Sequence, residues 1–522
     1  MRPDLTEPFI VTAKAVIRGV DSKGRAEIVD DAGILIERGR VIEIGGAASL
    51  VEKHRGVRVE AQPSCIAMPG LINAHHHSGL TPLQLGVPFY PLELWLPRFM
   101  GMRHVDPRLD TLYSAIEMLE SGTTTVHHIQ GGTYGPSSTW GATADAIISA
   151  YREIGMRVSY SFMIRDQNQV LFDSDDSFLS MLPPELSAHF RPRLRSSLAP
   201  IAEQMSFFVD MKKRWEESDP EAVQMQLAPA NLHWCSDAAL IEIFRTARSH
   251  GVKLHMHLDE TAQQAEYARR RTGRSAVAHL AALGCLGPDL TIGHGIWVEE
   301  SDLDLLAHHR CCICHNASSG LRLASGIAPV NRARAKGVRV ALGIDQSGVN
   351  DDRDMLQEMR VVWMLHREPG LFRQRPSTVD VFQMATENGA ATTNFEGMIG
   401  RLDPGRGADI VLVDWATVSE PYLDQATSLL DALIHRAKSR SVNQVYVAGT
   451  LVVDRGRVCQ IDRGGALDGI RNALAKPLTA VEREAREAVE AAMPYIESYY
   501  SRQQATCSVA TSTYAYNKLV LS

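Results

Sequence analysis

Short apolar runs alternate with longer amphipathic stretches through the middle of the chain. Runs such as "MRVSYSFMI", "GVKLHMHL", "DLTIGHGIWV", "RCCICHN" and "GVRVALGID" predict buried strands. The stretches "DPRLDTLYSAIEMLESG" and "DAALIEIFRTARSHG" are typical of amphipathic helices that end at glycine. Repeated strand and helix units over roughly 340 residues predict parallel strands, in an open sheet or a closed (β/α)₈ barrel. In a barrel, the strand ends carry the active site.

Two similar hairpin patterns flank this middle segment. "DAGILIERGRVIEIG" has two apolar runs that turn at Arg38-Gly39, and "YVAGTLVVDRGRVCQI" repeats the pattern near the other end of the chain. The similarity predicts that the two terminal regions meet in one small β domain into which the middle is inserted. We therefore expect an α/β protein, a (β/α)₈ TIM-like barrel over residues 67–404 with a composite β-sandwich domain formed by residues 1–66 and 405–465.

The segment after the second hairpin predicts a helix. In "PLTAVEREAREAVEAAMPYIESYY", Thr479 and Glu482 form a capping box. An apolar stripe follows the helical period, at Val481, Val489, Met493 and Ile496. We expect a helical extension over residues 466–504 that packs on the barrel or on a partner subunit. Residues 505–522 show no usable periodicity, and we expect them to form a flexible tail.

Composition and charge narrow the classes of partner. The net charge of −7 disfavours a general polyanion binder, so nucleic acid is not expected as a substrate. The opening "MRPDLTEPFIVTAKAVIRGV" contains acidic residues and a proline where a signal peptide has an uninterrupted apolar stretch, and no later run reaches membrane-spanning length. We expect a cytosolic protein without membrane attachment.

The eight cysteines show no framework spacing, so reduced thiols are expected. Cys311, Cys312 and Cys314 stand beside His315 in "CCICHNASSG", a pattern that invites a zinc-cluster interpretation. Small apolar residues filling a buried strand are the favoured interpretation, because no second CxxC or HxxxH lies near.

Histidines and carboxylates end several of the apolar runs. In "PGLINAHHHSG", His75 and His77 share one face of a strand and His76 points to the other, because side chains alternate along a strand. Further polar residues follow other apolar runs, at His255, His257, Glu260, His294 and Asp345. Burial of these groups would be costly without a partner, and a metal ion with a bound water supplies one for all of them.

These motifs resemble a known family. "PGLINAHHH", "HMHLDE", "GHGIWV", "CHNASSGLRLASGIAPV" and "LGIDQS" are similar to the signature of the amidohydrolase superfamily, in the branch of cytosine-deaminase-like and triazine-hydrolase-like (ATZ/TRZ) aminohydrolases. The resemblance extends from the first hairpin through "GRLDPGRGADIVLVD" to the second. It implies that one divalent metal is bound by His75, His77, His257 and Asp345. Relatives with two metals use a carboxylated lysine on the fourth strand, and the matching "VQMQLAPANLHW" contains none. Zinc is the expected metal, with iron(II) as the alternative.

The resemblance also implies a division of catalytic labour. Glu260 would be the proton-transferring carboxylate, and His294 would hydrogen-bond the attacking hydroxide or the substrate. A divalent ion lowers the pKa of its water towards roughly 7, which creates hydroxide at neutral pH. Asp345 would accept the proton of that water, and Glu260 would protonate a ring nitrogen or the departing amine. His294 would stabilise the charge that develops in the tetrahedral intermediate.

Three candidate substrate contacts have specific alternatives. Trp95, in "PLELWLPRF", matches a pocket tryptophan of similar proteins and would stack on a heterocycle, or it plugs an aromatic core. Arg165 would hold a substrate carboxylate or form a surface salt bridge. His128 stands where relatives often carry an acidic residue, a departure that would mark altered substrate choice.

Three more candidates follow the last strands. His315 and Asn316 open the "HNASSG" loop, either as pocket residues or as an Asn-led turn. Gln346 follows the aspartate where relatives usually have Asp-Gly, and it either enters the pocket or turns away. His255 is expected to be a packed residue of the barrel interior, with substrate contact as the alternative. The departure at Gln346 puts the substrate in doubt, though not the metal.

Three functional hypotheses follow. The first is an aminohydrolase (deaminase) that releases ammonia or an amine from a C–N bond of a nitrogen heterocycle or amidine-like small molecule. The second is a hydrolase of an exocyclic amide, urea or carbon–halogen bond, and Glu260 favours the first because a proton donor helps a poor amine leaving group more than it helps chloride. The third is a non-catalytic metal-binding barrel, which the complete set of catalytic groups argues against. A homodimer or higher homo-oligomer is implied by the resemblance.

Overall fold

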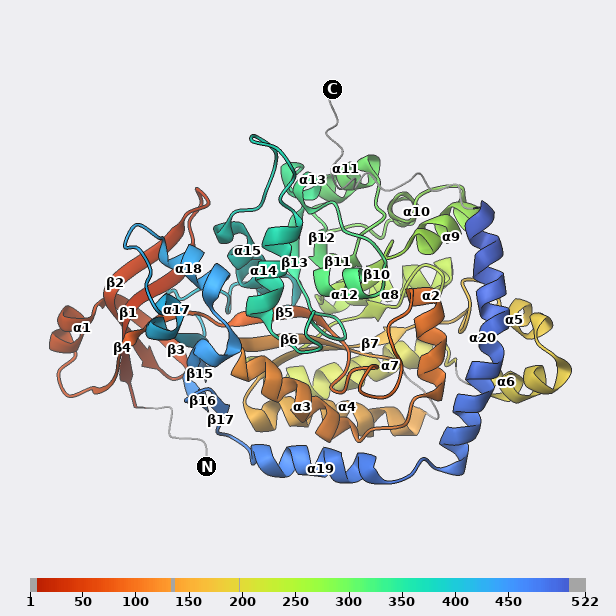
Figure 1. The fold of residues 1–522 in the computed structure, drawn as a ribbon, viewed down its shortest axis with the longest axis horizontal. Coiled ribbons are helices and arrows are strands. Elements are labelled where there is room, and N and C mark those ends of the chain that lie inside the picture. Colours follow the sequence, from red (N-terminus) through yellow and green to blue (C-terminus); the bar gives the residue numbers. More distant parts are fainter. Residues whose placement is uncertain (1–6, 133–136, 197, 507–522) are drawn as a thin grey trace.

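The computed structural model describes residues 7–132, 137–196 and 198–506. Parallel strands at the centre of the molecule carry the chemistry-bearing residues (Figure 1). One set pairs in the order β5-β6-β7-β8, with β9 also pairing with β7, and a second set pairs in the order β10-β11-β12-β13. Their bounds are β5 Leu71–His76, β6 Thr123–Gln130, β7 Arg157–Ile164, β8 Val223–Met225, β9 Ala228–Pro229, β10 Leu254–Leu258, β11 Leu290–His294, β12 Cys312–His315 and β13 Arg339–Leu342.

Two isolated parallel bridges connect these two sets. Leu227, between β8 and β9, pairs with Leu254 at the start of β10, and His76 at the end of β5 pairs with Asp345, which follows β13. Neighbouring strands therefore follow the order of the chain, and the last one returns to the first. This return brings the first histidine motif and the last carboxylate of the sequence to the same place.

Helices separate the strands in the sequence and surround them in space (Figure 1). Local sequence sets their ends: the side chain of Ser236 accepts a hydrogen bond from Ala239 at the start of α8, and Gly251 ends that helix in the left-handed conformation at φ 63°. The helices of this region are α2 Leu92–Trp95, η1 Leu96–Gly101, α3 Pro107–Glu120, α4 Ser137–Ile154, α5 Asp175–Met181, α6 Pro184–Ser196, α7 Ile201–Met211, η2 Lys212–Glu216, α8 Asp237–His250, α9 Ala262–Thr272, α10 Ala276–Ala282, α11 Glu300–His308, α12 Ala317–Arg322, α13 Val330–Ala335, α14 Met355–Leu365, α15 Thr378–Ala385 and α16 Glu387–Thr392.

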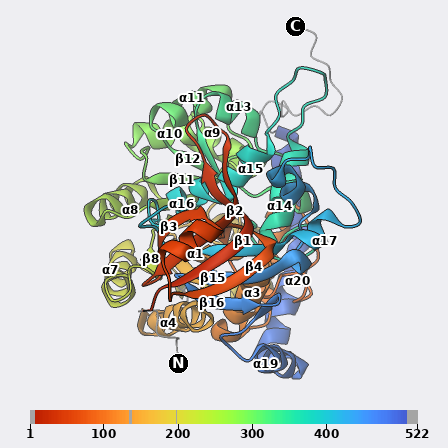
Figure 2. The ribbon, with the colours of Figure 1, turned by 90° about the vertical axis from the view of Figure 1, so that its left-hand side faces the viewer.

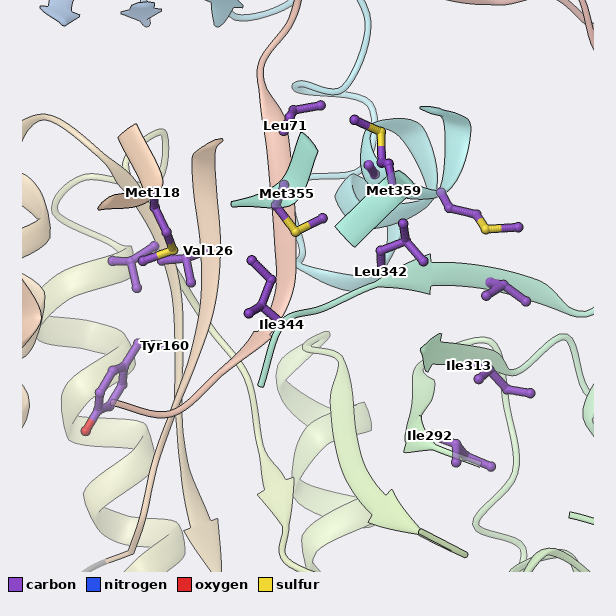
Figure 3. Close-up of a cluster of buried hydrophobic side chains, with 14 of the residues drawn as sticks. Leu71, Met118, Val126, Tyr160, Ile292, Ile313, Leu342, Ile344, Met355 and Met359 are labelled. Atoms are coloured by element: carbon purple, nitrogen blue, oxygen red, sulfur yellow. The ribbon is translucent and has the colours of Figure 1, made fainter. Parts of the chain in front are cut away.

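The central strands are buried on both faces, as is typical of parallel strands covered by helices. Apolar side chains from the strands and from the surrounding helices form one continuous cluster (Figure 3), which includes Leu71, Val126, Ile292, Leu342 and Met355. Burial of this set fixes the strands, so that the residues at their ends are held in place from below.

Both terminal regions contribute strands to one eight-stranded sheet, in the order β17-β16-β15-β14-β4-β1-β2-β3 (Figure 2). The N-terminal strands meet the C-terminal ones where β4 pairs antiparallel with β14, with Pro69 opposite Ile410. The first hairpin turns at Arg38-Gly39, as the sequence predicts, whereas the second pattern contains two turns, at Ala448-Gly449 and Arg455-Gly456. The elements are β1 Phe9–Val20, β2 Ala26–Glu37, β3 Arg40–Gly46, α1 Ala47–Lys53, β4 Arg58–Pro69, β14 Ile410–Asp414, α17 Trp415–Ser419, α18 Leu429–Arg436, η3 Ser439–Ser441, β15 Val442–Val447, β16 Thr450–Asp454 and β17 Arg457–Val458.

Two helices, α19 (Arg463–Ala475) and α20 (Ala480–Thr506), follow this sheet. The predicted capping box is present, because Thr479 N donates to Glu482 Oε2 at 2.8 Å and Glu482 N donates to Thr479 Oγ1 at 3.2 Å. Three members of the predicted stripe are buried, whereas Val481, in the first turn of α20, is 75% exposed.

The helix α20 packs on η1, α2 and α6 of the central region. It continues through Thr506, two residues past the predicted end of the extension, and the remainder of the predicted flexible tail, residues 507–522, lies outside the described residues. Within the described ranges, the helices are each too short or too polar to cross a bilayer.

A buried ion pair connects the central strands to the terminal sheet. Arg157, at the start of β7, donates from Nε to Asp409 Oδ2 at 2.8 Å and from Nη2 to Asp409 Oδ1 at 3.0 Å. Both side chains are almost fully buried, and Asp409 also accepts a hydrogen bond from Ala448 N. Removal of one partner would leave an uncompensated charge in the interior.

We therefore expect Arg157→Ala to destabilise the protein by about 3–5 kcal/mol, measured as a lower apparent Tm in thermal unfolding. The control is Arg108→Ala, which removes the exposed pair of Arg108 with Glu153 and should cost at most about 1 kcal/mol. Equal melting temperatures for the two variants would contradict the role given to the buried pair.

Candidate active site

Three strand ends, those of β5, β10 and β13, bring the four predicted metal ligands together. His75 Nε2 and His77 Nε2 are 3.0 Å apart, and His77 Nε2 is 3.0 Å from His257 Nε2, at the end of β10. Asp345 Oδ1, just after β13, lies 3.4 Å from His77 Nε2 and 3.8 Å from His75 Nε2. The middle histidine, His76, points away from them and stacks edge-on against His128, as the alternation along a strand predicts.

The donor atoms of this group fit a divalent metal. Ligand atoms on a tetrahedral ion at about 2.0–2.1 Å lie about 3.3–3.4 Å from each other, close to the separations between these nitrogen and oxygen atoms. Burial lowers the pKa of His75 and of His257 well below the ordinary value, so both rings are neutral and keep a lone pair for a cation. Three imidazoles and one carboxylate form a donor set that suits zinc or iron(II).

The second ring nitrogen of two ligands is also engaged. His77 Nδ1 lies 2.8 Å from the carbonyl oxygen of Ile129 and donates to it, which leaves Nε2 as the acceptor of a cation. His75 Nδ1 lies 2.8 Å from His255 Nε2. His255 is therefore a packed interior residue that contacts a ligand from behind, in agreement with the interpretation favoured from the sequence.

The carboxyl groups of Asp345 and Glu260 have different surroundings. Asp345 Oδ2 accepts a hydrogen bond from Ser319 Oγ at 2.6 Å, and its backbone has a φ of 65°. The side chain of Glu260 is buried, and burial, together with the nearby Asp345 and Glu93, holds its pKa well above the ordinary value. Glu260 is therefore suited to carry a proton at neutral pH.

His294 lies next to Glu260 and completes the group. Its Nε2 is 3.7 Å from Glu260 Oε2, and its Nδ1 is 3.4 Å from Asn316 Nδ2. Burial lowers the pKa of His294 to about 4, so the ring is neutral. A neutral imidazole at this position serves as a hydrogen-bond donor or acceptor toward a reacting group.

A cavity of about 380 Å³ opens above the metal-ligand group. Its lining includes His77, His257, Glu260, His294 and Asp345. Of the six predicted substrate contacts, Trp95, Arg165 and Gln346 line the cavity, and the ring of Trp95 is almost fully buried in its wall. The cavity has the size and the mixed apolar and polar lining of a small-molecule site.

The other three predicted contacts are outside the lining. His128 Nδ1 lies 3.0 Å from the hydroxyl of Tyr151 on α4, and His315 Nε2 lies 2.9 Å from His366 Nε2. Each follows a strand residue that faces the interior, so alternation turns both away from the cavity toward the helices. Asn316 contacts His294 and is not among the lining residues of the cavity. The structure does not support direct substrate contact by these three residues.

Several lining residues carried no signal in the sequence. Phe172, Trp234 and Tyr500 belong to two loops and to α20, where no strand end or motif marks them. Ser319, which hydrogen-bonds Asp345, stands within the quoted "HNASSG" loop, and its role becomes visible only once α12 is placed beside β13. The cysteines near it are buried in and beside β12, and within the described residues the possible metal clusters include Cys314 alone of the three, with His75 and His255.

The comparison with known proteins agrees with the geometry. A model of the Amidohydrolase family matches residues 66–452. The 5-methylthioadenosine/S-adenosylhomocysteine deaminase of Syntrophobacter fumaroxidans is 29% identical over 467 residues, which cover 88% of this chain and 97% of the relative.

Solved structures show the same fold. An adenosine deaminase from Xanthomonas campestris with bound zinc is similar with a TM-score of 0.73 at 22% identity, covering 92% of this chain and 98% of the other. Atrazine chlorohydrolase from Arthrobacter aurescens, complexed with zinc, has a TM-score of 0.75 at 20% identity, covering 89% of this chain and 99% of the other.

The chain belongs to the amidohydrolase family, whose model covers well over half of its length. Its fold is of the TIM-barrel type, with mixed helices and sheets. The resemblance seen in the motifs is thereby confirmed, as is the expectation of a metal-dependent aminohydrolase that acts on a C–N bond of a heterocycle.

The helix that carries Ser319 rests on a buried carboxyl group. Glu358, on α14, accepts hydrogen bonds from the backbone N of Ser318, at 3.0 Å, and from its hydroxyl. Burial raises the pKa of Glu358 from 4.5 to about 7. Between these values the folded protein binds a proton that the unfolded chain does not, so the free energy of unfolding falls as the pH rises through this window.

Glu358→Gln removes this titration. As the pH rises from 5 to 8, we expect the wild type to lose about 3 kcal/mol of stability that the variant does not lose. The Tm of the variant should therefore rise relative to that of the wild type between these two pH values. The exposed Glu153→Gln is the control and should show no such change. A constant Tm difference between Glu358→Gln and wild type at both pH values would contradict the prediction.

Proposed function

We propose that the protein deaminates adenine nucleosides, with one divalent metal ion, zinc in the first place and iron(II) as the alternative. The observation that carries the proposal is the convergence of His75, His77, His257 and Asp345 beside the buried carboxyl of Glu260 at the wall of the cavity. The relative from Syntrophobacter fumaroxidans, named as a deaminase of two adenine nucleosides, supports this substrate class.

Different residues of the chain have different roles in the proposed hydrolysis. When bound, a divalent cation supplies Lewis-acid activation of water. Asp345, within reach of the same centre, takes the proton of the attacking water, and Ser319 fixes its other oxygen. Glu260 gives its proton to the ring nitrogen beside the reacting carbon. The proton held by Asp345 then passes to the amine, which leaves as ammonia when the C–N bond breaks, and the hydroxyl proton of the intermediate returns to Glu260 as the new C–O bond becomes a carbonyl. His294 donates to the oxygen that gains charge on the way.

A carbon–halogen, exocyclic amide or urea bond is the second candidate. The likeness to atrazine chlorohydrolase, at 20% identity, concerns the fold. The protonated Glu260 favours amine release, because ammonia needs a proton in order to leave and chloride does not. The proposal is tested by a screen for ammonia release from adenine nucleosides, other purines, pyrimidines, pterins and triazines. If none of these compounds releases ammonia, the amide or urea alternative is favoured.

We also propose a domain architecture for the chain. The order of pairing and the bridge from His76 to Asp345 support a closed (β/α)₈ barrel over residues 67–404. The eight-stranded sheet supports a composite domain built from residues 1–66 and 405–465, with a helical extension after it. A homo-oligomer, a cytosolic location and the absence of nucleic-acid partners stay predictions from the sequence.

Replacement of the proton donor should separate binding from turnover. For Glu260→Gln we expect metal content equal to that of the wild type, because Glu260 is not among the ligands, and a fall in kcat of about a hundredfold or more. The control is Glu497→Gln on the exposed face of α20. Unchanged turnover would remove Glu260 from the mechanism.

Removal of a ligand should act on the metal itself. For His257→Ala we expect the zinc or iron found by elemental analysis to drop well below one ion per chain, with turnover falling in parallel, since one of three imidazoles is lost. His308→Ala, at an exposed position at the end of α11, is the matched control. Full occupancy in His257→Ala would refute the ligand assignment.

A further inference from the structure

Gln346, where the motif resemblance predicts a departure from similar proteins, lies in the cavity wall directly after Asp345. Its side chain is not free to turn, because Ser78 Oγ donates a hydrogen bond to Gln346 Oε1 at 2.6 Å. Ser78 itself follows His77 and lines the same cavity. The carbonyl end of the amide is therefore occupied by a neighbouring residue.

The amide nitrogen of Gln346 is available for a hydrogen bond with a ligand. Among the residues that the structure describes, no acceptor lies within hydrogen-bond distance of its Nε2, and this atom is not sealed in the interior. A glutamine held in this way keeps both N–H donors for the cavity, while Ser78 uses one lone pair of its oxygen. The cavity wall thereby offers N–H donors beside the carboxyl oxygens of Asp345.

The two loops that hold this pair are tied to each other at further points. Arg353, in the loop that begins at Gln346, donates to the carbonyl oxygens of Ser78, at 3.2 Å, and Gly79. Thr81 Oγ1 donates to Asp351 Oδ2 at 2.9 Å.

Asp110 of α3 fixes the first loop from the other side, because it accepts hydrogen bonds from Gly79 N at 2.7 Å and Leu80 N at 2.6 Å. A side chain at position 79 would collide with the backbone of Asp110, so the loop passes as close to α3 as a glycine allows. Ser78 is thus a fixed anchor for the amide.

We infer that Gln346 is a specificity-determining residue that donates a hydrogen bond to an acceptor of the substrate's heterocycle, a ring nitrogen lone pair or a carbonyl oxygen. The inference rests on the proposed function. A substrate with such an acceptor forms a hydrogen bond with the amide. A substrate with a C–H in its place leaves a donor unpaired, and this penalty discriminates between the two substrates. Ser78 is the positioning residue of this contact.

The test combines substitutions in the protein with substitutions in the substrate. The parent substrate is 5′-methylthioadenosine, and its 3-deaza and 7-deaza analogues each replace one ring acceptor with C–H. The variants are Gln346→Met, which removes the donor at similar size, and Gln346→Glu, which replaces the amide nitrogen with an oxygen. Exposed Gln374→Met is the matched control. Metal content and Tm are measured for every variant, so that loss of fold is seen separately.

For the parent, we expect Gln346→Met to lower kcat/KM by about 10- to 100-fold and Gln346→Glu to lower it further, at unchanged metal content. For one of the two deaza analogues, wild type and Gln346→Met should give the same kcat/KM, because the acceptor is already missing. Ser78→Ala should lower kcat/KM of the wild type for the parent and have no further effect in the Gln346→Met background.

Two outcomes overturn the inference in an active enzyme: an equal penalty of Gln346→Met on the parent and both analogues, or no penalty on the parent. Either result leaves the proposed function intact. A wild type that releases no ammonia from the parent or from the other adenine nucleosides overturns the proposed function, and the inference with it. The two failures are therefore distinguished by the wild-type assay alone.

Discussion

The close approach of three imidazole nitrogens and one carboxylate oxygen, in a place that water scarcely reaches, is the interaction on which the molecule depends. Without a cation, the lone pairs of His75, His77 and His257 would face each other at hydrogen-bond distances with little to offset their desolvation. A divalent ion converts this unfavourable arrangement into a stable one. The order of the strands serves this arrangement, because the segment after β13 pairs with the end of β5 and so brings Asp345 to His77.

Around this centre, polar groups are arranged so that each reacting residue keeps one defined role. The carbonyl of Ile129 orients His77, Ser319 holds one oxygen of Asp345, and Gln264 accepts from the backbone of Glu260. The two carboxyl groups differ in their surroundings: burial raises the pKa of Glu260, while Asp345 belongs to a group of side chains that could hold a cation. The cost of such strained or buried positions, including the left-handed backbone at His294 and Asp345, is met by the dense packing of the strands beneath.

The sequence is most informative where a histidine or carboxylate follows an apolar run that predicts a strand. His75, His77, His257, His294 and Asp345 were all recognisable because each polar group ends an apolar run, and alternation explained why His76 points away. The same alternation in "TTTVHHIQ" and "CICHN" is consistent with the positions of His128 and His315 outside the cavity. Phe172, Trp234 and Tyr500 were beyond reach, because loops and a helix from distant parts of the chain are placed by tertiary packing, which no local pattern records.

The helix α20 lies across the molecule from the terminal sheet (Figure 1) and places Tyr500 in the cavity wall, where its hydroxyl accepts a hydrogen bond from the backbone of Phe172 at 3.1 Å. The residues that activate water and those that shape the outer chamber thus belong to parts of the chain that can vary independently. A substitution at Tyr500 would therefore reshape the cavity wall without moving the residues at the strand ends.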